Sequence, residues 1–328
     1  MTNNLPEGKL NNNLLKKIIE DINNSSSIKP KIGEDAVEIN IEIYKEILVS
    51  SDPITFEADN IGSYLIDVCS NDIYASGGTP KWLIITCLIP INTSFEEIRK
   101  NLSKLNKRAK LHDIDIIGGH TEVTSSVNKI IMSGTIIGVY NKHFTKDLKI
   151  RPDQDIILGG LAGVEGSKMI STTIKPNSSE TKKLDQKSKH LSLSVKEIAK
   201  YALEAGQVVK MHDPTEGGIA TAIHEITELG EVGCKIQFKK IKFVESFKET
   251  CQKLRLNPLG VISSGCLLII SEQENSNKII EALKKNKISA SIIGKTTKKE
   301  KGNIININDK LIKLERFDQD EIIKIFKE

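Results

Sequence analysis

The chain lacks any apolar run long enough to cross a lipid bilayer. Its longest apolar runs, such as WLIITCLIP, stop well short of the ~20 residues that a membrane-spanning helix needs. The first residues, MTNNLPEGKL, also lack a basic stretch followed by an apolar segment, so they do not resemble a signal peptide. These absences argue against a membrane partner and lead us to expect a cytoplasmic protein.

Aromatic residues are scarce and there is no strong excess of charge. Aromatics make up 4% of the 328 residues, which leaves little surface on which nucleic-acid bases could stack. The 47 basic and 43 acidic residues give a net charge of +4, and the lysines are scattered in short clusters. We therefore expect no nucleic-acid partner.

Paired cysteines are missing as well. The five cysteines show no C-x-x-C spacing: Cys69, Cys87, Cys234, Cys251 and Cys266. Three of them lie inside apolar segments. This pattern predicts reduced, structural thiols rather than disulfides or a zinc site.

Several familiar catalytic motifs are absent. The chain contains neither G-x-x-x-x-G-K-[ST] nor G-x-G-x-x-G, so it has neither a P-loop nor a Rossmann fingerprint. It also lacks G-x-S-x-G, and no cysteine lies in a glycine-rich or basic setting, which argues against a serine or cysteine nucleophile. A nucleotide, if one binds, must bind by another architecture.

What is present is the composition of a globular protein, 38% hydrophobic and 27% charged, in a chain long enough for two domains. We expect a polar arm with one helix over residues 1–32, a first domain over 33–147 and a second over 148–328. The boundary lies in the polar segment HFTKDLKIRPDQD. Strands and helices alternate in both domains, which predicts α/β and α+β layers.

The clearest helix is predicted over residues 95–111, where Ser94 and Glu97 form a capping box and apolar residues recur every three or four positions. A second helix is expected over residues 61–76. Strands are expected at 36–41, 46–56, 81–90, 114–119, 129–140, 156–160, 234–238, 265–270 and 288–294.

Asp72 is the most informative carboxylate. It follows Leu65, Val68 and Cys69 by helical spacings, so it falls on the apolar face of its helix. A buried carboxylate needs a partner, and no lysine or arginine occurs between Lys45 and Lys81. A magnesium ion could supply the missing charge. Pairing with a distant basic residue is the alternative.

Two glycine pairs could let backbone N–H groups approach a phosphate. One lies in IIGGHTEVT, residues 116–124, and the other in TEGG, residues 215–218. Each has a structural alternative. The first glycine pair is equally typical of a tight turn. Residues Asp213 to Glu216 also have the pattern of a capping box with proline at the first helical position, and Gly230 would end that helix.

His120 and His212 stand beside these glycine pairs. Either could act as an acid–base group, a ligand or a hydrogen-bond donor to phosphate. A single histidine is as readily explained by a structural role, so both readings stay open.

Taken in order, five stretches resemble one superfamily: GEDAVEI, SSDPITF, VCSNDIYASGGTPKWLIITCLIP, IIGGHTEVT and MHDPTEGGIATAIHEI. This superfamily comprises aminoimidazole ribonucleotide (AIR) synthetase, selenophosphate synthetase, thiamine-monophosphate kinase and the hydrogenase-maturation protein HypE. The resemblance runs from about Gly33 to about Gly294 and is greatest to HypE-like, synthetase-related proteins.

The resemblance implies a two-domain, synthetase-like fold, in which the sheet of the N-terminal α/β domain forms a barrel across a homodimer and an α+β sandwich follows. It implies ATP and Mg²⁺ as cofactors. By motif, Asp35, Asp52, Asp72 and Glu122 are the implied metal ligands; Asp72, His120 and Asp213 the implied catalytic residues; and Asn71, Gly118, Gly119, Thr121, Thr215, Glu216, Gly217 and Gly218 the implied nucleotide-binding residues.

The implied reaction is ATP-dependent phosphorylation or activation of a carbonyl- or amide-type oxygen, on a small molecule or a protein side chain. The sequence departs from each subfamily. HypE carries a C-terminal cysteine, whereas no cysteine follows Cys266 here, and thiamine-monophosphate kinase has aspartate where this chain has His120. Two alternatives therefore remain: the HypE function with the cysteine supplied in trans, and a catalytically silent nucleotide-binding scaffold.

Overall fold

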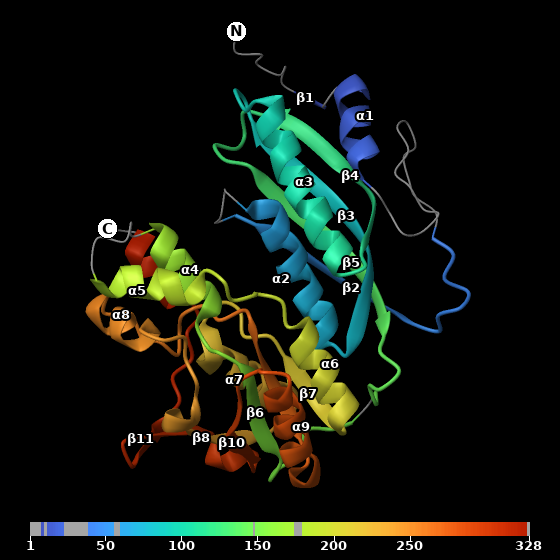
Figure 1. The fold of residues 1–328 in the computed structure, drawn as a ribbon. Coiled ribbons are helices and arrows are strands. Elements are labelled where there is room, and N and C mark those ends of the chain that lie inside the picture. Colours follow the sequence, from blue (N-terminus) through green and yellow to red (C-terminus); the bar gives the residue numbers. More distant parts are fainter. Residues whose placement is uncertain are drawn as a thin grey trace. The chain divides into compact units, whose positions relative to one another are not determined.

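The computed structural model describes residues 8–9, 12–22, 39–55, 60–146, 148–173 and 179–326. The chain forms two compact units (Figure 1). Unit 1 comprises residues 1–74 and 78–141, and unit 2 comprises residues 75–77 and 142–328. None of the helices in the described ranges is both long and apolar enough to cross a membrane.

Unit 1 is built on a five-stranded sheet with the order β1-β4-β3-β5-β2. Its strands are β1 (Gly8–Lys9), β2 (Ile47–Ile54), β3 (Gly78–Pro90), β4 (Asp115–Thr124) and β5 (Ile131–Tyr140). Strands β3 and β4 are parallel, and the other neighbouring pairs are antiparallel. The helix between β3 and β4 makes this parallel crossover possible.

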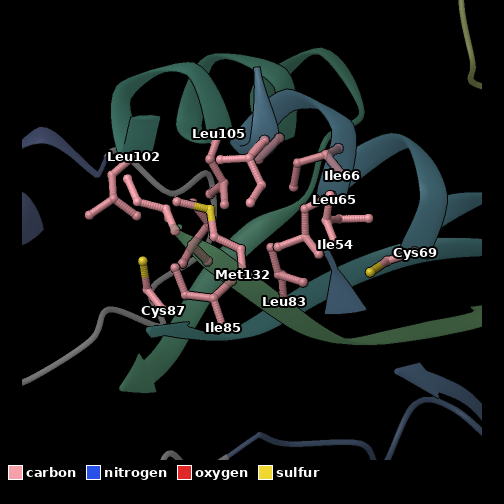
Figure 2. Packing of buried hydrophobic residues seen from close by; sticks show 14 of the residues in the cluster. Ile54, Leu65, Ile66, Cys69, Leu83, Ile85, Cys87, Leu102, Leu105 and Met132 are labelled. Carbon is pink, nitrogen blue, oxygen red and sulfur yellow. The ribbon is translucent and has the colours of Figure 1, made fainter. Parts of the chain in front are cut away.

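Helices α2 (Ile61–Ala75) and α3 (Phe95–Leu111) cover one face of this sheet. Leu65 and Cys69 from α2 and Leu102 and Leu105 from α3 pack against strand residues such as Met132 (Figure 2). Helix α3 has the predicted bounds, and Ser94 Oγ accepts the Glu97 N–H at its start, which confirms the capping box. Helix α1 (Asn12–Asp21) contributes Ile18 to the same core.

The opposite face of the unit 1 sheet carries no helix among the described residues. Along β2, Ile47, Val49 and Ser51 are exposed, whereas the residues between them point toward the helices. The register places them in line with half-buried β5 residues, Val49 opposite Ile137 and Ser51 opposite Thr135. A sheet face that exposes apolar residues such as Ile47 and Val49 in this way is a surface that a further layer could cover.

Unit 2 is built on a seven-stranded sheet with the order β12-β11-β8-β10-β6-β9-β7. The strands are β6 (Asp155–Gly160), β7 (Val208–His212), β8 (Gly233–Gln237), β9 (Cys266–Ser271), β10 (Ala290–Thr297), β11 (Asn303–Ile307) and β12 (Lys310–Lys313). Only β8 and β11 pair in parallel among these neighbours.

Helices lie on both faces of the unit 2 sheet. Helix α7 (Gly218–Leu229) packs its apolar side on strand residues such as Ile156 and Leu158. Helices α6 (Lys196–Ala205) and α9 (Gln273–Lys285) pack on the other face, where a side chain at Gly159 would meet residues of both. The remaining helices are α4 (Val164–Thr173), α5 (Ser179–Ser188), α8 (Phe247–Lys253) and the short 3-10 helices η1 (Phe238–Lys240), η2 (Lys299–Lys301) and η3 (Glu321–Phe326).

Most predicted elements are confirmed, and three interpretations are corrected. Residues 39–41 do not form the expected strand, and Ile41 is exposed without a sheet to join. The stretch 116–124 is no turn, because it lies within the continuous strand β4. The capping box from Asp213 is also wrong, since α7 begins only at Gly218 and Gly217 is its N-cap; Gly230 does end the helix.

All five cysteines are buried and free, which confirms their structural role. Burial raises the pKa of each thiol, to about 12 for Cys87 and Cys234, so none is poised as a nucleophile.

Candidate active site

Two carboxylates face each other beneath the unit 1 sheet. Asp52 on β2 and Asp72 on α2 interact directly, and Ser50 Oγ donates a hydrogen bond of 2.5 Å to Asp72 Oδ2. Burial and the adjacent Asp72 carboxylate raise the pKa of Asp52 to about 7. The Oδ2 atom of Asp52 is buried and has no hydrogen-bond partner among the described residues.

The alternation of side chains along β2 explains why Asp52 and Asp72 lie close together. Ser50 and Asp52 point to the same side of the strand as Ile54, which belongs to the core beneath α2. Asp72 reaches them because it lies on the sheet-facing side of α2, as the helical spacing predicted.

The alternative of pairing with a distant basic residue applies to a different aspartate. Asp67 receives two hydrogen bonds from Arg108, Nε to Oδ1 at 2.7 Å and Nη2 to Oδ2 at 3.0 Å, and lies 3.3 Å from His112 Nε2. Neither Asp52 nor Asp72 forms an ion pair with a basic side chain in the part of the chain that the structure describes. A divalent cation is therefore a chemically suitable partner for the Asp52–Asp72 pair.

The other predicted site residues of unit 1 lie on β4. His120 Nε2 is 3.3 Å from Glu122 Oε2, and the two side chains are 42% and 40% exposed. Through β3, His120 aligns with Thr86 and with Ser133 of β5, so the pair projects from the open face of the sheet.

This placement separates the predicted metal ligands within one chain. Asp52 and Asp72 lie on the helix-covered face, whereas Glu122 lies on the open face and three strands away. No group of three or more metal-ligating side chains occurs within the described ranges. Asp35 lies outside the described residues. Unit 1 therefore brings together two of the four predicted ligands, because strand alternation sends the third to the other side.

The glycines of β4 differ from each other. A Cβ at Gly119 would lie 2.1 Å from the carbonyl oxygen of Ile85 on β3, and the residue has φ +155°. A Cβ at Gly118 would meet nothing within 4 Å. Gly119 is therefore fixed by packing within the sheet, while Gly118 leaves room for a ligand on the open face. Thr121 points to the opposite side from His120, and Asn71 is fully buried in α2.

In unit 2, the glycines of TEGG are explained by the chain itself. A Cβ at Gly218 would lie 2.5 Å from Val261 O, and one at Gly217 would lie 2.6 Å from Phe317 O. The N–H of Gly218 bonds Thr215 O, and the N–H of Gly217 bonds Asp320 Oδ2 at 2.8 Å. These amides are engaged within the protein, which counts against the expected phosphate cradle at Gly217 and Gly218.

The side chains around this turn still offer polar groups. Thr215 is half-buried, Glu216 is exposed and Asp213 is buried at the end of β7. His212 Nε2 lies 2.7 Å from Glu225 Oε2, and this hydrogen bond lowers the pKa of Glu225.

Asp320 was not among the residues predicted from the sequence, although its buried carboxylate accepts the Gly217 N–H of the TEGG turn. Burial raises its pKa to about 6, and Ile322 N–H donates to its Oδ1 at 2.9 Å. No local pattern in residues 317–326, FDQDEIIKIF, indicates this contact, because Gly217 is 103 residues away.

Comparison with known proteins agrees with this architecture. Residues 33–140 match the N-terminal domain, and residues 151–306 the C-terminal domain, of the AIR synthase related proteins. A putative hydrogenase expression/formation protein of Methanocaldococcus jannaschii is 28% identical over 310 residues, 91% of both chains. Carbamoyl dehydratase HypE of Bradyrhizobium diazoefficiens is 24% identical over 237 residues, 71% of this chain and 67% of the relative.

Among solved structures, the hydrogenase maturation protein HypE in complex with ATP superposes with a TM-score of 0.76 at 22% identity. The match covers 89% of this chain and 90% of that one. The expected two-domain, synthetase-like fold is thereby confirmed. Since the two family domains together span most of the sequence in the expected order, the chain belongs to the AIR synthase related protein family.

Proposed function

We propose that this protein is an ATP- and Mg²⁺-dependent enzyme of the HypE type, which phosphorylates or otherwise activates a carbonyl- or amide-type oxygen of an acceptor. The single observation that carries the proposal is the Asp52–Asp72 pair, two adjacent carboxylates with no basic partner in the described residues. The family membership and the ATP complex of a HypE structure support the choice of nucleotide.

The two carboxylates fit a magnesium site. Bound Mg²⁺ would neutralise charge on the transferred phosphoryl group. Asp52 and Asp72 would hold the ion from one side, with Ser50 orienting the Asp72 carboxylate through its hydrogen bond. Magnesium keeps several waters and phosphate oxygens in its coordination shell, so two protein carboxylates suffice. Asp35 remains a proposed third ligand.

His120, Glu122 and Gly118 are proposed from the family motifs as ligand contacts separate from the metal-binding pair, because they lie on the open face of the sheet whereas Asp52 and Asp72 lie on the helix-covered face. The His120–Glu122 pair is half-exposed, and Gly118 leaves its side of β4 open to close approach. Thr121, Asn71 and the residues Asp213 to Gly218 stay proposals from the family motifs. For Gly217 and Gly218, a structural role is the better-supported explanation.

We further propose that the protein is a homodimer in which a second copy covers the open sheet face. This face exposes Ile47 and Val49 beside Ile137, and β2 forms the edge of the sheet. A second sheet packed on it would bury these apolar residues. Analytical ultracentrifugation tests the dimer, and Val49→Asp is the variant expected to dissociate it.

The HypE reaction itself is the more specific candidate. Relatives across most of the chain are named carbamoyl dehydratase or hydrogenase formation protein. A partner would then supply the carrier cysteine, because every described cysteine of this chain is buried. Dehydration of a carbamoylated peptide cysteine, added together with MgATP, distinguishes this acceptor from a small molecule.

Asp72→Asn is expected to reduce Mg²⁺-dependent ATP turnover by about 100-fold or more, since losing a metal-binding carboxylate removes several kcal/mol of charge stabilisation. The measurement is ADP, AMP and phosphate release with and without Mg²⁺. Asp309→Asn is the matched control, because Asp309 is exposed in a turn at φ +62°, which asparagine tolerates.

Two outcomes would contradict this prediction. If neither the native protein nor Asp72→Asn turns over ATP although both bind it, the protein is a nucleotide-binding scaffold. If MgATP leaves the melting temperature of the native protein unchanged, the protein does not use ATP.

A further inference from the structure

One row of side chains crosses four adjacent strands of unit 2 and carries three lysines. The strands β10, β8, β11 and β12 lie next to one another in the sheet (Figure 1). Lys295 of β10 lies directly opposite Lys235 of β8. Ile304 of β11 follows in the row, and Lys313 of β12 ends it. Residues opposite each other on neighbouring strands project from the same face, so the three lysines share one face of the sheet, here called the basic face.

The basic face continues the side of the sheet on which α6 and α9 pack. Lys295 pairs in register with Asp155 of β6, which points to the same side as Gly159 beneath those two helices. On the reverse side of β8, Ile236 packs in the core with α7. The side chains of the three lysines are exposed. This part of the sheet is therefore accessible on one side and core on the other.

The charge on the basic face is only partly balanced. Lys295 Nζ lies 3.5 Å from Asp155 Oδ1, and this carboxylate is almost completely buried. Lys235 and Lys313 form no ion pair with any side chain in the described ranges. Like charges directly opposite each other destabilise a sheet, so the opposition of Lys295 and Lys235 has an energetic cost that folding does not explain.

Protection of the sheet edge accounts for only part of this pattern. Lysines on an edge strand keep it from pairing with other chains, which explains Lys310 and Lys313 on β12. This reason does not apply to Lys235, since β8 lies two strands in from that edge. A cluster of lysines that reaches into the sheet is instead typical of a surface that attracts negative charge.

The neighbouring row favours a polypeptide as the source of that negative charge. Gln237, Asn306 and Leu311 lie opposite one another on the basic face, and Leu311 is 54% exposed. Neither row contains an aromatic side chain on which a nucleic-acid base could stack. With strands about 4.8 Å apart, the three lysines span about 14 Å, which about five extended residues cover.

We propose that the basic face is the docking site for an acidic segment of a partner protein. Carboxylates of that segment pair with Lys235 and Lys313, and an apolar side chain between them packs on Ile304. All of these residues lie in unit 2 and outside the motifs that imply the nucleotide site, so the proposal goes beyond the proposed function. It stands whether or not the protein uses ATP.

The test measures binding of a fluorescently labelled decaglutamate peptide to the full chain. Replacing both Lys235 and Lys313 by glutamine should raise Kd by about 5-fold or more at about 50 mM NaCl. The Kd of the native protein should also rise with salt, because exposed charge pairs are screened. Each single variant, Lys235→Gln or Lys313→Gln, should act in the same direction and serves if the double variant fails to fold.

The matched control replaces Lys100 and Lys107 by glutamine. These exposed lysines of α3 lie seven residues apart, about 10 Å along the helix, so the control removes the same charge over a similar distance. It should leave the Kd for decaglutamate within about 2-fold of the native value. Equal weakening in the control, or no binding of the peptide to the native protein at the lower salt, would overturn the docking site and leave only attraction to net charge.

Two further measurements keep the proposal open to contradiction. Lys235→Gln removes the repulsion toward Lys295, so its melting temperature without ligand should equal or exceed that of the native protein. A lower melting temperature would show that Lys235 serves the fold and would overturn the proposal. Tighter binding of a single-stranded DNA of equal charge than of decaglutamate would assign the basic face to nucleic acid and overturn it as well.

Discussion

Asp52→Asn is expected to stabilise the ligand-free protein at pH 8 by about 2 kcal/mol. The pKa of Asp52 is raised from 3.8 to about 7 by burial and by the Asp72 carboxylate. A pKa difference of about three corresponds to at most about 4 kcal/mol in the free energy of unfolding. We halve this value because solvent reaches part of the side chain. Asparagine has no charge to lose, so the variant avoids this cost.

The pH dependence has a definite sign. Between about pH 4 and pH 7 the folded state retains a proton on Asp52 that the unfolded state has released. The contribution of Asp52 to the free energy of unfolding therefore falls as pH rises through this window. The difference between Asp52→Asn and the native protein should be small near pH 4 and full above pH 7, as measured by urea unfolding at several pH values.

Asp67→Asn is the matched control and should act in the opposite direction. The Asp67 carboxylate is 10% exposed and is bound by both Arg108 and His112. Removing its charge leaves the guanidinium of Arg108 without its partner, which should cost about 3 kcal/mol. A destabilised Asp52→Asn protein at pH 8 would contradict the assignment of an uncompensated carboxylate pair.

Magnesium connects this prediction to function. If Asp52 helps to hold Mg²⁺, saturating Mg²⁺ should raise the melting temperature of the native protein and should do so much less in Asp52→Asn. A variant that is more stable without the metal and less responsive to it would show that the pair is retained for binding and not for folding.

Gly119→Ala is expected to destabilise the protein by about 3 kcal/mol or more. The added Cβ would lie 2.1 Å from the carbonyl oxygen of Ile85, a backbone atom of the central strand β3 that cannot move without disturbing the sheet. The residue also has φ +155°, where an alanine is strained. Thermal and urea unfolding of the ligand-free protein measure the effect.

Gly118→Ala is the control from the adjacent position. Because its Cβ meets nothing within 4 Å, the free energy of unfolding should change by less than about 1 kcal/mol. If Gly118 admits a ligand to the open face, the same variant should nevertheless weaken MgATP or acceptor binding. Equal destabilisation by both alanines would show that the β4 backbone differs from the one described.

Several helices and strands were predictable from the sequence alone. Helix α3 and its Ser94 cap, helix α2 and most strands are set by short-range apolar spacing and by local hydrogen bonds, so they were predictable. The position of Asp72 on the sheet-facing side of α2 was predictable for the same reason. The continuation of β4 beyond Gly119 to Thr124 was not predictable, because a glycine pair has the same local meaning in a turn and in a crowded strand.

The candidate site likewise combines features that the sequence predicts with contacts that it does not. Motif order alone identified the family and indicated nucleotide chemistry, since those motifs are linear in the chain. It could not show that Asp52 and Glu122 leave the sheet on opposite faces, which depends on the register of four strands. Nor could it reveal Asp320, whose partner lies 103 residues away.

The sequence by itself therefore determined the family and the two-domain α/β character, and it placed Asp52 and Asp72 among four candidate metal ligands. Only the tertiary structure decided which polar groups meet: Asp72 with Asp52 and Ser50, Asp67 with Arg108, and Asp320 with Gly217. The physical reason is that helical and strand periodicity act over a few residues. Contacts between distant carboxylates and their partners depend instead on sheet register and chain packing, which no short stretch of sequence contains.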